Sequence, residues 1–270
     1  MLLTACSSVF FYPKKKHIST PSGLGLHYQD VYLTSQEGMG IHGWFLPAVQ
    51  DSLNQAQGTV YFLHGNAENI STHIHNVRWL PSEGYNVFLI DYRGFGLSQG
   101  SPSVAGALDD IRLGFQWLLE NEQVDNQSIF LLGQSLGASL GLYFSATDPL
   151  ANQYLRGVVS DAGFTRYRDI AKHVANGHWL TWLFQYPLSW SVVRDFDAID
   201  VVDKIAPIPI LFIQSRDDRI IPYSYAEMLY EKSKQPKMLF TTRGPHTATF
   251  KSRRNQLQLI EFFEGKQARN

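Results

Sequence analysis

The chain has a single cysteine, Cys6, among its 270 residues, so no disulfide can form within it. Acidic and basic residues nearly balance at a formal net charge of −1, which gives no reason to expect nucleic acid as a partner. The body of the chain contains no apolar run long enough to cross a bilayer, no low-complexity tract and no internal repeat. With 44% hydrophobic residues, it has the composition of one folded domain with a substantial core.

Several motifs of metal and cofactor chemistry are also missing. The chain contains no H-E-x-x-H, no G-x-x-x-x-G-K-S/T and no C-x-x-C. His73 and His75 are two residues apart, so on a helix they would diverge and could not share a zinc ion. Gly23-Leu24-Gly25 lacks the third glycine and the preceding strand of a dinucleotide site. We therefore expect neither a metal nor another cofactor.

The first 27 residues form a distinct N-terminal segment. Leu3-Thr4-Ala5-Cys6 resembles the lipobox of a bacterial lipoprotein, but the charged and apolar regions of a signal peptide do not precede it. Two interpretations stay open. The true start lies upstream of Met1 and Cys6 carries a lipid that anchors the protein to a membrane, or the protein is cytoplasmic and begins with an apolar strand.

Residues 28–270 read as one α/β domain. Alternating apolar and polar residues near 28–47 predict an antiparallel hairpin. Short apolar runs further along predict strands that are buried on both faces, and helical segments separate them. This alternation predicts a mostly parallel, doubly wound sheet of about eight strands. The predicted buried strands are 59–63, 86–90, 128–132, 155–160, 208–213 and 237–241.

Helical regions are predicted around this sheet. Residues 71–82 and 250–264 look helical, and Ser101 with Pro102 is expected to open a helix with one apolar face. Residues 166–200 break the alternation, because five aromatic side chains follow at irregular spacing between residues 179 and 190. We interpret this segment as a small helical lid over the active site, although the aromatic residues could also simply fill the core.

The pentapeptide Gly133-Gln134-Ser135-Leu136-Gly137 lies between a predicted strand and a predicted helix. This is the setting of a nucleophile elbow, in which a tight turn exposes a serine hydroxyl at the end of the sheet. Both flanking residues are glycine because the turn leaves no room for a Cβ. Ser135 is therefore the predicted nucleophile.

A serine nucleophile needs a base, and the base needs an acid to orient it. After an elbow these follow in the order serine, acid, histidine, which Asp218 and His246 satisfy. Each comes just after a predicted strand, so both should lie at the edge of the sheet where Ser135 emerges. Asp217 competes with Asp218, and Asp161 is a more distant rival.

The oxyanion that forms during acyl transfer needs two N–H donors. One is expected from the backbone of Leu136, and the other from Asn66 or, alternatively, Ala67 in the loop after residue 63. His64 is expected to brace this loop by hydrogen bonding, and Asp91 to satisfy backbone donors in its own turn.

Together these motifs resemble the α/β-hydrolase superfamily over residues 28–264. Residues 64–68 (H-G-N-A-E) are similar to its oxyanion loop, and residues 91–98 (D-Y-R-G-F-G-L-S) to its D-x-R-G-x-G-x-S segment. The H-G-N-A-E form looks like the branch of serine-aminopeptidase-like and depalmitoylase-like hydrolases, which includes bacterial lipoproteins. Gly244-Pro245-His246 departs from the pattern, because many relatives have glycine or alanine before the histidine.

The resemblance implies a serine hydrolase that acts on a small-molecule or acyl substrate, and we expect a carboxylic-ester hydrolase working through an acyl-enzyme. A thioesterase or protein deacylase is the nearest alternative. A serine aminopeptidase would need an acidic pocket for the substrate amine, for which Glu68 is a candidate. An alternative of another class is a non-catalytic binding protein on a hydrolase scaffold.

Overall fold

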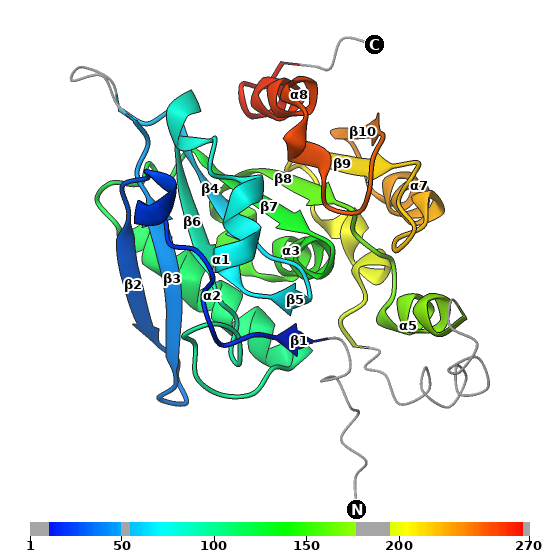
Figure 1. Ribbon diagram of the computed structural model, residues 1–270. Helices are drawn as coiled ribbons and strands as arrows, with labels where there is room; N and C mark the ends of the chain where they lie inside the picture. Colours follow the sequence, from blue (N-terminus) through cyan, green and yellow to red (C-terminus); the bar gives the residue numbers. More distant parts are fainter. Residues whose placement is uncertain (1–10, 50–54, 177–194, 267–270) are drawn as a thin grey trace, which may run out of the picture.

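The computed structural model describes residues 11–49, 55–176 and 195–266. Their centre is an eight-stranded sheet in the order β10-β9-β8-β7-β4-β6-β3-β2 (Figure 1). Only the pairings of β2 with β3 and of β3 with β6 are antiparallel, so the predicted hairpin and the mostly parallel sheet are both confirmed. The strands are β2 (Gln29–Thr34), β3 (Gly40–Leu46), β4 (Gly58–Leu63), β6 (Tyr85–Ile90), β7 (Ile129–Gln134), β8 (Leu155–Asp161), β9 (Ile210–Ser215) and β10 (Lys237–Thr242).

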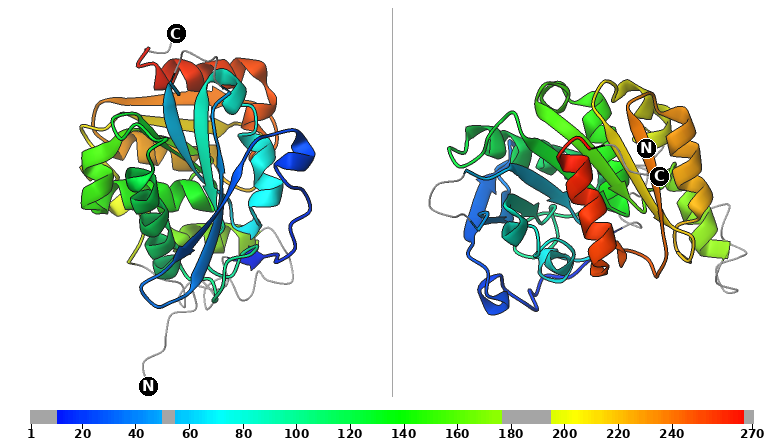
Figure 2. Two further views of the ribbon diagram at one scale, coloured as in Figure 1. Left: turned by 90° about the vertical axis from the view of Figure 1, so that its left-hand side faces the viewer. Right: turned by 90° about the horizontal axis from the view of Figure 1, so that it is seen from above.

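Helices cover both faces of this sheet (Figure 2). On one face Ile111 of α2, Leu140 of α3 and Leu229 of α7 belong to a continuous apolar core with the strands. On the other face Ile74 and Leu259 belong to a second core. Every residue of β4, β6, β7 and β9 is buried, as expected for strands between two layers. The principal helices are α1 (Ile70–His73), α2 (Val104–Glu120), α3 (Leu136–Thr147), α4 (Pro149–Tyr154), α5 (Tyr167–Asn176), α7 (Tyr223–Lys232) and α8 (Arg253–Phe263).

Two helical predictions need correction. Helix α2 starts two residues later than expected, because the hydroxyl of Ser103, not that of Ser101, caps it by accepting the N–H of Gly106 at 3.1 Å. The helix expected over residues 71–82 is instead three short pieces, α1, η3 (Ile74–Asn76) and η4 (Pro81–Glu83). A proline at residue 81 cannot donate a helical hydrogen bond, so a continuous helix is disfavoured there.

The chain before β2 lies against the domain in an extended arm. Its strand β1 (Tyr12–Pro13) pairs in parallel with β5 (Ala67–Glu68) and forms a second, two-stranded sheet. Phe11 is buried against Phe95, with ring centroids 6.0 Å apart. The arm is therefore part of the folded domain and contacts the loop after β4.

Some predictions fall outside the described residues. Cys6 and its lipobox lie in residues 1–10, and most of the expected lid lies in residues 177–194. The anchor and the lid therefore stay predictions. Among the helices of the described segments, none is long and apolar enough to span a membrane.

Candidate active site

Ser135 occupies the sharp turn between β7 and α3. Its backbone is strained, with φ 54° and ψ −116°, and its side chain is nearly buried. A Cβ at Gly133 would lie 2.3 Å from the carbonyl oxygen of Gly137, and one at Gly137 would lie 2.2 Å from that of Leu63. Any larger residue at either position would collide with backbone, so the two glycines allow the elbow to form.

The structure brings Ser135, His246 and Asp218 into one line of hydrogen bonds. His246 Nε2 lies 3.0 Å from Ser135 Oγ, and His246 Nδ1 lies 2.7 Å from Asp218 Oδ2. With Nδ1 protonated and donating to Asp218, Nε2 is free to accept the serine proton. Asp218 follows β9 and His246 follows β10, which are adjacent parallel strands ending at the same edge.

Asp218, and not Asp217, points toward the imidazole. Its side chain is 1% exposed and also accepts the backbone N–H groups of Ile220 and Ile221 at 2.8 and 3.0 Å. Burial raises the pKa of Asp218, but the hydrogen bonds from His246 and from these N–H groups outweigh it, so the pKa lies below its ordinary value. Asp217 faces outward and pairs with Arg243 at 2.8 Å.

Asp161 has a different place in the site. It ends β8, fully buried, and its carboxylate accepts hydrogen bonds from Gln134 Nε2 at 2.7 Å and from Thr249 Oγ1 at 2.8 Å. Its backbone oxygen accepts the N–H of Ser135 at 2.9 Å. Burial raises the pKa of Asp161 to about 6. Asp161 thus joins the elbow to the segment after His246 but does not hydrogen-bond to the imidazole.

The loop after β4 passes directly beside the serine. A Cβ at Gly65 would lie 3.7 Å from Ser135 Cβ, so Asn66 follows at close range. Within the described residues, the N–H groups of Asn66 and Leu136 do not donate to a backbone carbonyl of another element, and Leu136 is the first residue of α3. The roles of these two N–H groups as oxyanion donors stay predictions.

Two histidines hold this loop in place. His64 hydrogen-bonds through Nδ1 to the Gly65 oxygen at 2.7 Å and stacks on Tyr92 with ring centroids 4.2 Å apart, so it braces the loop as expected. Burial lowers the pKa of His64 to about 3, so the ring is neutral. His73 donates from Nε2 to the Ala67 oxygen at 3.0 Å.

The N-terminal arm supports the same loop from outside. The N–H of Tyr12 donates to the Asn66 oxygen at 2.8 Å, and that of Lys14 to the Glu68 oxygen at 3.0 Å. The Lys14 ammonium also pairs with the Glu68 carboxylate at 2.9 Å. Glu68 is therefore occupied by the arm.

A cluster of polar side chains fastens the arm to the sheet. His17 Nε2 lies 2.9 Å from Asp91 Oδ2, and His42 Nδ1 lies 3.8 Å from the same oxygen. Ligand atoms of His17, His42 and Asp91 lie within 4.8 Å of one another, and in the described part of the chain this is the one group with metal-ligand spacing. Asp91 also accepts the N–H of Ile70 at 2.9 Å, so this backbone donor belongs to α1 and not, as expected, to the turn that contains Asp91.

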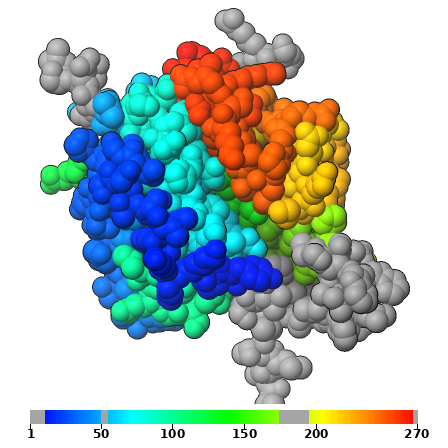
Figure 3. All heavy atoms as spheres, in the orientation of Figure 1, coloured from blue at the N-terminus to red at the C-terminus, as the bar shows by residue number. Residues whose placement is uncertain are grey.

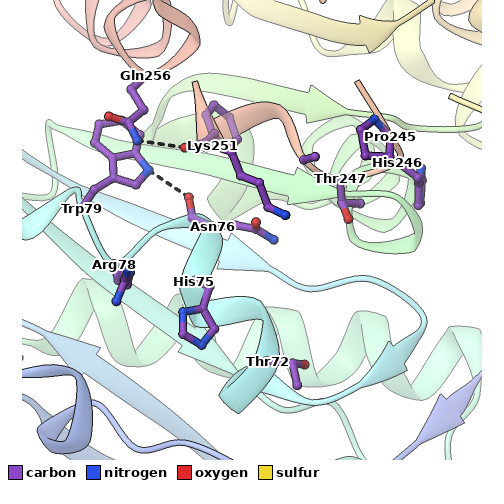
Figure 4. Close-up of a pocket in the computed structure, with 12 residues that line it drawn as sticks. Thr72, His75, Asn76, Arg78, Trp79, Pro245, His246, Thr247, Lys251 and Gln256 are labelled. Carbon is purple, nitrogen blue, oxygen red and sulfur yellow. Dashed lines mark hydrogen bonds between the residues drawn. The ribbon is translucent and has the colours of Figure 1, made fainter. Parts of the chain in front are cut away.

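A cavity of about 720 Å³ opens beside His246. His75, Asn76 and Arg78 line one side, and residues of the loop after β10 and of η8 (Thr249–Lys251) line the other. Figure 3 shows these two segments, cyan and orange-red, facing each other across a hollow in the surface. In the close-up, the side chains of Lys251 and Asn76 point into the space between the two segments (Figure 4).

Comparison with known proteins places the chain in a family. The family described as serine aminopeptidase, S33 matches residues 54–194. The protein YfhR of Escherichia coli K12, described as uncharacterized, is 31% identical over 260 residues, covering 94% of this chain and 85% of its own length. The chain belongs to this family of α/β hydrolases.

More distant likenesses agree with that assignment. The alpha/beta hydrolase domain-containing protein WAV2 of Arabidopsis thaliana is 28% identical over 250 residues, covering 88% of this chain and 78% of its own. Among solved structures, the Pyrococcus furiosus esterase Pf2001 superposes with a TM-score of 0.73 at 21% identity, covering 95% of each chain. At that identity the likeness shows the fold.

Sequence reasoning missed two features of this hydrolase. The pairing of β1 with β5 joins backbone groups of two short segments, and neither segment has a strand pattern. The cationic lining of the cavity comes from Arg78 and Lys251, which lie more than 170 positions apart, so no local motif could point to it. Arg78 and Lys251 each look like ordinary surface residues in the sequence.

Proposed function

We propose that the protein is a serine hydrolase that cleaves carboxylic esters through an acyl-enzyme. The observation that carries the proposal is the hydrogen-bonded line from Ser135 through His246 to Asp218. A serine hydroxyl is a weak nucleophile at neutral pH, and a neutral imidazole within 3.0 Å can take its proton as it attacks. The proposed reaction uses these three side chains, two backbone N–H donors and water.

In the proposed first half-reaction, Ser135 Oγ attacks the acyl carbon while its proton passes to His246 Nε2. The backbone N–H groups of Leu136 and Asn66 stabilise the oxyanion. Asp218 stabilises the imidazolium, which then donates its proton to the departing alcohol. Water attacks the acyl-enzyme in the second half, with the same imidazole as base, and the acid is released.

A fluorophosphonate probe tests the nucleophile, because it labels only an activated serine. The wild type should be labelled and Ser135→Ala should not, with ester turnover lowered by at least about 10⁴-fold. Ser101→Ala, at an exposed position, is the matched control and should be labelled as the wild type is. Equal labelling of Ser135→Ala and the wild type would refute the assignment.

A thioesterase or protein deacylase would use the same groups, so substrate panels must separate them. 4-Nitrophenyl esters of rising chain length, run beside the matching thioesters, give the preference directly. An aminopeptidase receives less support, because Glu68 is paired with Lys14 and the cavity lining contains no carboxylate. Ligand binding without turnover of any panel member would favour a non-catalytic scaffold.

A further inference from the structure

The cavity beside His246 is cationic. Its lining includes Arg78 and Lys251, and none of the lining residues is Asp or Glu. The chain as a whole has slightly more acidic than basic residues, 24 against 23. The absence of carboxylates from this lining is therefore a local feature, and not a consequence of overall composition.

The two permanent charges have no partner inside the described part of the chain. No ion pair or side-chain hydrogen bond is formed there by the guanidinium of Arg78 or the ammonium of Lys251. Nearby Arg253 contrasts with them, because it is held by Glu83 at 2.6 Å. Two unpaired cations that face one cavity raise the local concentration of an anionic ligand.

The position of the imidazole indicates which half of an ester enters this cavity. In serine hydrolysis the histidine donates its proton to the leaving group, so the leaving group departs on the side of that ring. His246 itself lines the cavity, together with its neighbours Pro245 and Thr247. The cavity therefore lies on the side where the alcohol or thiol half of the substrate departs.

We infer that the leaving group bound in this cavity carries an anionic group, a carboxylate or a phosphate, which Arg78 and Lys251 recognise. The inference rests on the proposed function and names its substrate class. A guanidinium binds either anion through two N–H donors, and an ammonium adds a point charge.

The rest of the wall supports a leaving group with an apolar body. Trp79 and Phe250 lie side by side there, with ring centroids 6.2 Å apart. Trp79 is fixed by its Nε1–H, which donates to the Asn76 oxygen at 2.9 Å, and Gln256 donates to the Phe250 oxygen at 2.8 Å (Figure 4). A substrate ammonium would find no carboxylate among these residues.

A matched substrate pair tests the inference. 4-Acetoxybenzoate and 4-acetoxybenzamide have the same acyl group and the same leaving-group shape, but differ by one negative charge. The measured quantity is the ratio of their kcat/KM values, compared between wild type and variants, so that intrinsic reactivity cancels. Arg78→Ala and Lys251→Ala should each lower the ratio about fivefold, as expected for one partly exposed charge pair. The double variant should lower it by roughly 25-fold if the two effects add.

Further arms identify the anion and its place. 4-Acetoxyphenyl phosphate in place of the benzoate shows whether phosphate or carboxylate is preferred. The monoester of glutaric acid with 4-nitrophenol, compared with 4-nitrophenyl butyrate, puts the charge on the acyl side, where the same variants should have no effect on the ratio.

Arg156→Ala removes an exposed cation on β8 and should leave both activities unchanged. Added salt should lower the wild-type ratio.

Two outcomes overturn the inference and leave the proposed function intact. If the ratio is the same in the wild type and the double variant while 4-acetoxybenzamide is hydrolysed, the cations do not recognise the leaving group. If the variants change only the acyl-side ratio, the anion lies on the other half of the substrate. If instead the amide is not hydrolysed and Ser135 is not labelled by a fluorophosphonate, the proposed function has failed and this inference with it.

Discussion

Asp161→Asn should stabilise the protein at neutral pH and have little effect in acid. The Asp161 carboxylate is fully buried, and its hydrogen-bond partners in the described part of the chain, Gln134 and Thr249, are uncharged; burial raises its pKa to about 6. Asparagine has the shape of the protonated acid. It can accept from Gln134 Nε2 as Asp161 does, and the Thr249 hydroxyl can rotate to accept from its amide.

The sign follows from the two pKa values. As pH rises from the ordinary 3.8 to about 6, the unfolded chain loses this proton while the folded protein keeps it. Stability therefore falls through that window, and the full loss is present above it. The difference corresponds to about 3 kcal/mol at 1.36 kcal/mol per pH unit, or roughly 5 °C in Tm for a chain of this length.

Thermal unfolding of wild type and variant between pH 4.5 and 7.5 measures this directly. The advantage of Asp161→Asn should be small at pH 4.5 and should grow toward about 3 kcal/mol at pH 7.5. Asp195→Asn removes an exposed carboxylate and serves as the control for the change in net charge. A stability difference between variant and wild type that does not vary with pH, or a variant less stable than the wild type at pH 7.5, would refute the reasoning.

Three further predictions concern the loop, the elbow and the arm. Tyr12→Pro removes the N–H that donates to Asn66 and should lower kcat about tenfold. The control Tyr12→Ala keeps that N–H. Equal ester turnover by the two variants would contradict a positioning role for the arm. Gly137→Ala places a Cβ against the Leu63 oxygen and should lower the free energy of unfolding by about 3 kcal/mol, and a urea titration showing a loss below about 1 kcal/mol would contradict this. Burial lowers the pKa of His42, but the nearby Asp91 carboxylate and the hydrogen bond to Asp30 outweigh this and raise it, so the stability that His42 adds is present below pH 6.5 and is lost as pH rises above it. The Tm gap to His42→Gln should therefore narrow between pH 5.5 and 8.5, and a constant gap would show that this titration is not linked to folding.

Much of the fold and of the candidate site could be predicted because close packing restricts those positions severely. A strand between two helical layers must be apolar on both faces, so β4, β6 and β7 stand out in the sequence. The elbow is equally restricted, since backbone atoms close to Gly133 and Gly137 leave no room for a side chain. Ser135, Asp218 and His246 each follow a strand, β7, β9 and β10, and these parallel strands end at the same edge of the sheet.

Other features depend on contacts that leave no local pattern. The start of α2 is decided by which of two nearby serines reaches the N–H of Gly106, and serine is a favoured capping residue at either position. The part played by Asp161 depends on Gln134 and Thr249, which approach it from different elements. A single sequence contains these residues but does not tell which of them meet.

The pairing of β1 with β5 has a practical consequence for work on this enzyme. A fusion partner placed just before Tyr12 would be attached to β1. This strand pairs with β5, which directly follows the loop beside Ser135. Helix α8, by contrast, ends far from that strand (Figure 1). An affinity handle or a surface-immobilisation linker therefore belongs at the carboxyl end, where mechanical load or bulk leaves the reaction centre undisturbed.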